Sequence, residues 1–269
     1  MTPVLRLTRA VFVLATLLTG GAGLALVAFP GRTDDYWAWT IAAAPTAAFL
    51  GAGYVGAAVS LGLAARERAW PNARLIAVLA LTLTTLTLLV TLRDLEPFAL
   101  EAAGVTGVFA WTWLAVYVLL PPLALTAFVL QERAGGRHDY DAAAARPGAR
   151  LGLGLAGILL AAVGVGLLLD WNAIEQRWPW PLTRLTAGIV GAWLCTYAAG
   201  FLWFTLRERS WRRMRVGAVG LVVTILLHAV SAARLWEDFD GDASSIVYVA
   251  SLAALLAAIA AAAVAEQRR

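Results

Sequence analysis

The chain has 269 residues and a formal net charge of +4, and 61% of its residues are hydrophobic while only 14% are charged. With a mean hydropathy of +0.75, this composition excludes an ordinary soluble domain and indicates an integral membrane protein. All 21 basic residues are arginine and there is one cysteine, Cys195, which excludes a retinal Schiff base on lysine and an internal disulfide.

Eight apolar stretches follow one another along the chain, each close to or above the roughly 20 residues that a membrane-spanning helix needs. They cover residues 10–29, 40–65, 74–92, 105–131, 150–169, 181–206, 214–234 and 244–265. In lipid each backbone polar group must be satisfied within its own segment, so these stretches are expected to be helices. The first stretch could also be a cleaved signal peptide, but its length favours a retained helix. The predicted fold class is therefore an all-α integral membrane protein with eight transmembrane helices.

Basic residues gather in alternate loops. The N-terminus, the loops at 66–74, 132–150 and 207–215 and the C-terminus carry 16 arginines and six acidic residues. The other four loops, with the helix ends that face them, carry five arginines and eleven acidic residues. Such an excess marks the cytoplasmic side. We therefore expect both termini in the cytoplasm, in a bacterial plasma (inner) membrane, and these arginine positions account for the basic pI without a nucleic-acid partner.

The chain contains an internal repeat. Residues 37–98 align without a gap with residues 178–239, at an offset of 141. Sixteen of the 62 positions are identical, and ten of these are Trp, Arg, Glu or Phe, which coincide by chance less often than Ala or Leu in so apolar a chain. Each half holds an even number of spans, so the halves should share one orientation. The predicted organisation is two tandem parallel four-helix repeats, at 1–131 and 150–269, joined by a cytoplasmic linker at 132–149.

The outer ends of the predicted helices carry matched charged and aromatic residues. Arg93 and Glu96 end the third span, and Arg234 and Glu237 end the seventh; the spacing i, i+3 places each pair on one helical face. Four tryptophans precede the second and sixth spans, at Trp37, Trp39, Trp178 and Trp180. Together they could frame a mouth in which arginine orients a carboxylate or phosphate and tryptophan stacks on a flat ligand. The alternative is an aromatic belt with charge pairs that hold helix ends in place.

His228 is the only histidine inside a predicted span, about six residues from Arg234, and its counterpart in the first half is Thr87. One interpretation is a polar cavity between the halves, in which His228 contacts a ligand or accepts a proton. The other is a neutral histidine and threonine hydroxyls that bond to neighbouring backbone. The matched Arg-Glu-Arg-x-Trp motifs at 66–70 and 207–211 likewise could hold anionic lipid head groups or only mark the cytoplasmic interface.

Several chemistries are disfavoured by residue type. A bis-histidine haem needs a second histidine in the membrane, and a metal centre needs clusters of His, Cys or carboxylates, so no cofactor and no metal are expected. The loop that holds Asp238, Asp240 and Asp242 does not have the spacing of a calcium-binding loop. A hydrolase built on Ser231 and His228 lacks an orienting acid nearby, so an enzyme is the least favoured class and no catalytic residue is predicted.

Two patterns resemble a group of uncharacterised bacterial multi-pass membrane proteins. They are Trp37-Ala38-Trp39-Thr40 leading into Thr46-Ala47-Ala48-Phe49-Leu50-Gly51-Ala52, and Trp178-Pro179-Trp180-Pro181-Leu182-Thr183. The resemblance covers most of the chain and implies a multi-pass fold, but no activity, cofactor or catalytic residue.

Two functions follow as hypotheses. The first is binding or transport of a small apolar or weakly anionic molecule at the interface of the repeats. The residues expected to contribute are His228, Thr87, Arg93, Glu96, Arg234, Glu237, Trp37 and Trp178. The second is a non-catalytic accessory or structural subunit that binds another membrane protein; in both cases the lipid bilayer is a partner.

Overall fold

A computed structural model describes residues 2–135 and 145–267. Residues 136–144 of the predicted linker lie outside the described residues. The elements are α1 (Arg6–Ala28), η1 (Pro30–Arg32), α2 (Thr33–Tyr36), α3 (Ala44–Arg66), α4 (Trp70–Arg93), α5 (Val105–Ala134), α6 (Pro147–Leu169), α7 (Trp171–Glu175), α8 (Arg184–Trp203), η2 (Phe204–Glu208), α9 (Trp211–Arg234), η3 (Trp236–Asp238) and α10 (Ala243–Gln267). Within these residues the fold is helical, and its single isolated β-bridge joins Pro3 to Ala69.

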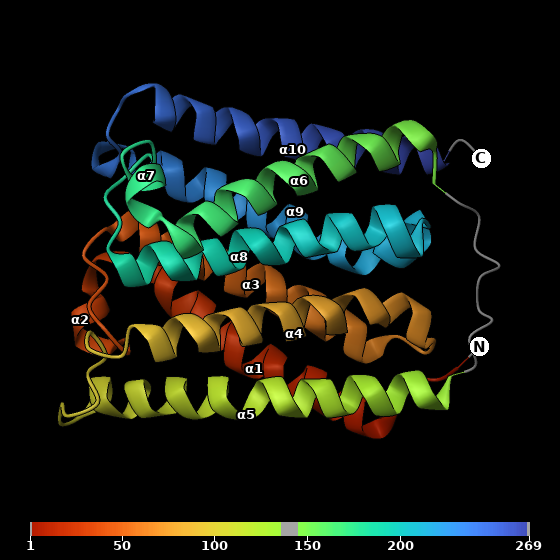
Figure 1. Cartoon of the computed structure of the whole chain (residues 1–269), viewed down its shortest axis with the longest axis horizontal. Helices are drawn as coiled ribbons and strands as arrows, with labels where there is room; N and C mark the ends of the chain where they lie inside the picture. The colour runs from red at the N-terminus through yellow and green to blue at the C-terminus, as the bar shows by residue number, and fades with distance from the viewer. Residues whose placement is uncertain (1, 136–144, 268–269) are drawn as a thin grey trace.

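Eight helices are long and apolar enough to cross a membrane, which confirms the all-helical prediction and the number of apolar helices within the described part of the chain. They contain between 23 and 30 residues, or at least about 34 Å at 1.5 Å per residue, against a hydrocarbon core about 30 Å thick. The helices lie side by side along the long axis of the molecule (Figure 1). The two marked chain ends lie at one end of this bundle, and α2 and α7 lie at the other.

Helices of the two halves are interleaved. α1 packs on α3 and α6 packs on α8, while α3 also packs on α9 and α8 on α4. A close crossing joins α3 to α9: a Cβ atom added to Gly220 would lie 1.9 Å from Ser60 Oγ and 2.4 Å from the carbonyl oxygen of Gly56. Such close approach needs small residues on both helices. Because α3 belongs to the first half of the chain and α9 to the second, this crossing joins the two halves.

Matched glycines mark the crossings within each half. A Cβ atom on Gly23 of α1 would lie 2.7 Å from the backbone nitrogen of Val55, and one on Gly164 of α6 would lie 2.9 Å from the nitrogen of Cys195. Gly23 and Gly164 are 141 residues apart, the offset of the sequence repeat, whereas Val55 and Cys195 are 140 residues apart. The gap-free alignment is therefore one residue out of register where α3 and α8 meet these glycines.

The register is restored at the end of α8. The chain reaches α8 one residue sooner after Trp180 than it reaches α3 after Trp39, and η2 is a π-helix of five residues. A π-bulge accommodates one extra residue within a helix. The offset consequently returns to its original value at Glu67 and Glu208. One shortened loop before α8 and one π-helix after it therefore explain why the residues on either side of α3 and α8 align without a gap, whereas the residues inside these helices do not.

Candidate ligand-binding site

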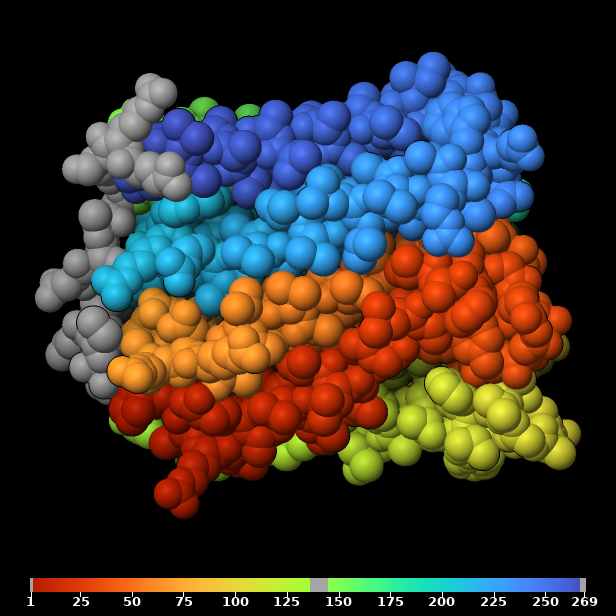
Figure 2. Space-filling view, turned by 180° about the vertical axis from the view of Figure 1, so that it is seen from behind, coloured from red at the N-terminus to blue at the C-terminus, as the bar shows by residue number. Residues whose placement is uncertain are grey.

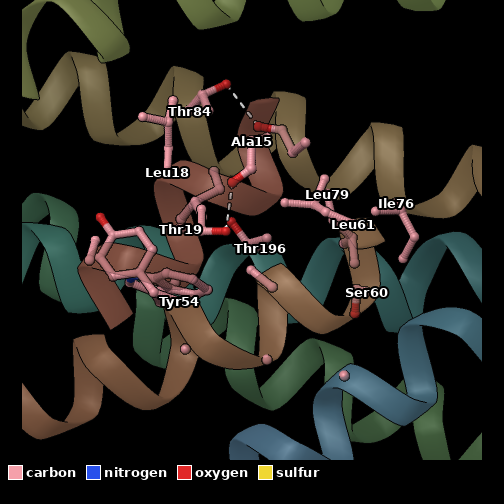
Figure 3. A pocket seen from close by; sticks show the side chains of 18 of the residues that line it. Ala15, Leu18, Thr19, Tyr54, Ser60, Leu61, Ile76, Leu79, Thr84 and Thr196 are labelled. Carbon is pink, nitrogen blue, oxygen red and sulfur yellow. Dashed lines mark hydrogen bonds between the residues drawn. The ribbon is translucent and has the colours of Figure 1, made fainter. Parts of the chain in front are cut away.

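A cavity of about 520 Å³ lies inside the bundle, lined by α1, α3, α4, α5, α8 and α9 (Figure 3). Cavities of roughly 300–1,000 Å³ are typical of small-molecule sites. Both halves contribute, and α3 and α8 do so at structurally equivalent positions: Gly53, Gly56, Ala57, Ser60 and Leu61 on α3, and Trp193, Thr196, Tyr197, Gly200 and Phe201 on α8. The cavity therefore lies where matched faces of these two helices meet.

The two matched faces differ in size. At two places α3 presents the small residues Gly53 and Ala57, whereas α8 presents Trp193 and Tyr197 there. A Cβ atom on Gly53 would lie 3.1 Å from the Trp193 ring, so the indole packs directly on the backbone of α3. The small residues of α3 leave space that extends toward α1, α4 and α5, which belong to the first half.

The cavity wall is apolar and carries no formal charge. None of the described residues that line it is Asp, Glu, Arg or His. Five threonine hydroxyls in the wall donate to carbonyl oxygens of their own helices: Thr19 to Ala15, Thr84 to Ala80, Thr112 to Val108, Thr196 to Ala192 and Thr224 to Gly220. Threonine satisfied in this way leaves a hydrocarbon-like surface. The wall suits a neutral, largely apolar molecule.

Two aromatic features supply the remaining polarity. The hydroxyls of Tyr54 and Tyr117 are 2.6 Å apart and join α3 to α5 in the cavity wall. The indole N–H groups of Trp37 and Trp193 and the hydroxyl of Tyr197 are buried without a hydrogen-bond partner, and all three residues line the cavity. Buried donors without a partner are costly, about 1–3 kcal/mol each. A neutral ligand with an oxygen in reach of either indole would remove that cost.

The matched arginines Arg93 and Arg234 both bind backbone carbonyls at helix ends. Nη1 of Arg93 donates to the carbonyl oxygen of Leu168 (2.6 Å), and Nη1 of Arg234 donates to the carbonyl oxygen of Val27 (3.0 Å). Both acceptors lie one residue before the end of a helix, where backbone carbonyls have no intrahelical partner and positive charge is favourable. Val27 and Leu168 occupy equivalent positions in the repeat, so each half caps a helix of the other half.

The predicted i, i+3 charge pairs at the rim are wrong. Arg93 pairs with Asp94 (2.7 Å), and Asp94 also pairs with Arg184 (3.2 Å). No ion pair within residues 2–135 and 145–267 involves Glu96 or Glu237. Arg93 pairs with Asp94 and not with Glu96 because its side chain extends toward the end of α6. There Asp94 also pairs with Arg184 at the start of α8.

His228 and Thr87 are buried, and neither is among the residues that line the cavity. Nδ1 of His228 is 3.0 Å from the Tyr248 hydroxyl, and its ring lies 4.6 Å from that of Phe49. Trp178 packs against Trp180 with ring centroids 5.4 Å apart. Of the eight residues predicted from the sequence to form the site, only Trp37 lines this cavity.

Each half carries an aromatic cluster at the end of the bundle that holds α2 and α7. Ring centroids of Trp39 lie 5.0 Å from Phe98 and 4.9 Å from Trp113; those of Trp180 lie 5.0 Å from Phe239 and 5.2 Å from Tyr248. The clusters differ in the hydrogen bonding of the matched tryptophans Trp180 and Trp39. Trp180 Nε1 donates to Thr46 Oγ1 (2.8 Å), whereas the Trp39 indole has no acceptor. Thr186, the counterpart of Thr46, is held in a capping box with Thr183, so its hydroxyl is already engaged.

A buried ionic network joins the halves at the opposite end of the bundle. The carboxylate of Glu208 accepts from Arg213 Nη1 (2.9 Å), from Arg74 Nη1 (3.3 Å) and from the Trp203 indole (3.3 Å). Arg74 also pairs with Glu132 at 2.8 Å. The side chains of Glu208 and Arg213 are only 4% and 7% exposed. Every charge in this network has a partner, so Glu208 of the second Arg-Glu-Arg-x-Trp motif contributes to helix packing.

The remaining site residues could not be chosen from the sequence. Tyr54 and Tyr117 stand on different helices without a motif, and small residues such as Gly56 equally predict close helix packing. Compared with protein-family models, curated proteins and solved structures, the chain gives no match. The geometry of the cavity is therefore what supports a function.

Proposed function

We propose that this chain is a multi-pass protein of a bacterial plasma membrane, built as two tandem four-helix repeats, that binds a small neutral apolar molecule between them. The single observation that carries the proposal is the uncharged cavity of about 520 Å³ lined by both halves. Sites of this kind are common between the helices of bundles.

Matched contacts support the repeat arrangement. The glycine crossings at Gly23 and Gly164, the reciprocal caps by Arg93 and Arg234, and the two aromatic clusters each occur once per half. Parallel repeats related by an axis along the membrane normal place such contacts at equal depth. Interleaving of α3 with α9 and of α8 with α4 is what this symmetry requires of the central helices.

The orientation is supported by the arginine-rich loops, which fall at the end of the bundle where the chain termini lie (Figure 1). In a Cys195→Ser background, Arg68→Cys and Asp240→Cys place single thiols at opposite ends. We expect a membrane-impermeant maleimide to label Asp240→Cys in spheroplasts and Arg68→Cys only after lysis. Labelling of Arg68→Cys in intact spheroplasts would refute the orientation.

The ligand proposed here is neutral, because Arg93 and Arg234 are engaged as helix caps and do not line the cavity. The test is native mass spectrometry of the protein extracted gently from its own membrane. We expect a reproducible additional mass of a few hundred daltons that Thr84→Trp, which fills the cavity, removes. Leu89→Trp is the matched control, since Leu89 is 58% exposed on the same helix. Binding that survives Thr84→Trp but is lost in Arg234→Ala would instead support an anionic ligand at the rim.

The second candidate function is an accessory subunit of a membrane complex. It is favoured by α10, where only 11% of the most apolar window is buried, against 67% in α3 and 61% in the α8 segment. A helix with so much free apolar surface can face lipid or a partner. Stable co-purification with one membrane protein, lost when Val247→Arg is introduced on the 62% exposed side chain of α10, would support this candidate; a monomer in mild detergent would contradict it.

A further inference from the structure

The cavity opens on the side of the bundle, between α1 and α5. Leu17 and Gly21 of α1 and Phe109 and Thr112 of α5 line the cavity and are also exposed on the outer surface, Leu17 by 69%. In the space-filling view from behind, the surface is hollowed where α1 (red) diverges from α5 (yellow to green) (Figure 2). A molecule dissolved in the bilayer could therefore reach the cavity without passing through water.

The cavity extends along most of the length of the bundle. Its wall on α5 runs from Phe109 to Leu120, which is about 16 Å at 1.5 Å per residue, and on α4 and α9 it continues to Leu75 and Met214, close to the first residues of these helices. Trp37 directly follows α2, and its ring centroid lies 6.2 Å from that of Phe109 at the mouth. At the far end the wall is formed by side chains such as Leu75 and Met214. The cavity thus has one unpartnered indole, Trp37, near the end of the bundle that carries α2, a second, Trp193, nine residues into α8, and mainly hydrocarbon walls toward the opposite end.

An uncharged, mostly hydrocarbon wall with an unpartnered indole at one end suits a neutral lipid with a single chain. A charged head group would lose its hydration beside a wall without counter-ions, which is strongly unfavourable. A neutral oxygen of an ester or ketone can instead accept from Trp37 or Trp193, whose indoles have no other acceptor. The hydrocarbon chain would lie along Leu79, Thr84 and Thr196, where the threonine hydroxyls are occupied by backbone.

We infer that one hydrocarbon chain of a neutral, single-chain membrane lipid enters this cavity sideways between α1 and α5, with its oxygen-bearing end toward Trp37. The inference rests on the proposed function, since it names the ligand class and the entry route of the same cavity. This inference is more specific than a general apolar site, because it requires that the ligand has an uncharged head group and that the ligand can pass Thr112 on its way into the cavity.

The experiment uses the full-length protein reconstituted in phosphatidylcholine vesicles. The probe is palmitic acid methyl ester carrying a photoreactive diazirine near the end of its chain, and labelled residues are mapped by mass spectrometry after illumination. We expect labelling of cavity residues on α4 and α8, competed by unlabelled methyl palmitate. The free acid carrying the same diazirine, at alkaline pH where it is ionised, should label these residues several-fold less.

Two variants test the route and the cavity. Thr112→Trp, at the mouth, should lower labelling at depth several-fold, whereas Val118→Trp, exposed on the same helix but absent from the cavity wall, should not. Thr84→Trp and, as a second filling variant, Ala80→Phe should abolish it. Trp37→Phe and Trp193→Phe should weaken labelling by the ester, compared with Trp39→Phe and Trp178→Phe, whose indoles are equally unpartnered but lie outside the wall.

The outcomes separate the two proposals. If cavity residues are labelled equally by the ionised acid, or if Thr112→Trp has no more effect than Val118→Trp, the lipid class or the route is refuted while ligand binding in the cavity stands. If the cavity residues of the wild-type protein are labelled by neither probe and native mass spectrometry finds no additional mass, the proposed function itself fails.

Discussion

Glu208 offers the sharpest test of how the halves are held together, because its loss leaves buried arginine without a counter-charge. Glu208→Gln keeps the size of the side chain and removes its charge. Arg213 then has no acidic partner among the described residues, while Arg74 retains Glu132. Breaking a buried ion pair from one side costs about 3–5 kcal/mol. Since Arg74 keeps one partner, we expect the lower end of that range, about 3 kcal/mol of unfolding free energy.

The matched control is Glu67→Gln. Glu67 occupies the equivalent position in the first half, is only partly buried and has one side-chain partner, Asn72, at 3.0 Å. Glu67→Gln leaves no buried arginine without a counter-charge and keeps an amide oxygen that can accept from Asn72, so it should cost about 1 kcal/mol or less. Both variants would be unfolded reversibly by titrating SDS into mixed micelles, with tryptophan fluorescence as the readout. Equal unfolding midpoints for the two variants would refute the claim that burial determines how much the motif glutamate contributes to stability.

Three further predictions concern the helix crossings and caps. Trp180→Phe removes a hydrogen bond to α3 and should cost about 1 kcal/mol more than Trp39→Phe, which removes none; the same SDS titration measures the difference. Gly220→Ala should separate α9 from α3 and cost about 1–3 kcal/mol or more, whereas Gly148→Ala, with no atom within 4 Å of the added Cβ, should be close to neutral in thermal unfolding. Hydrogen bonds from the side chain and backbone of Ser244, at the start of α10, lower the pKa of Asp242. Hydrogen-exchange protection of the first turn of α10 should therefore be full above the unfolded pKa of about 4 and decline as the pH falls below it. Asp242→Ala should remove both this protection and its pH dependence.

The internal repeat illustrates where sequence comparison reaches its limit. Tryptophans and arginines at the helix ends align at an offset of 141, because those positions have specific partners such as helix-end carbonyls. Inside α3 and α8 the true offset is smaller by one, which the contacts of Gly51 and Gly191 reveal. A gap-free alignment could not detect this, because a shortened loop before α8 and a π-helix after it compensate each other.

The sequence by itself determined the class of fold and the positions of the eight apolar helices. Apolar length and the distribution of arginine are local properties of a segment, and a bilayer leaves helix as the only open choice for each segment. The sequence also revealed matched residues such as Arg93 and Arg234, although not their roles as caps. Only the tertiary structure decided where the cavity lies and what forms it. Whether a glycine or threonine lines a cavity or fills a helix contact depends on the residue that faces it from another helix. Gly53 faces Trp193, which lies in the other half of the chain, and this pairing is set by how α3 and α8 pack together.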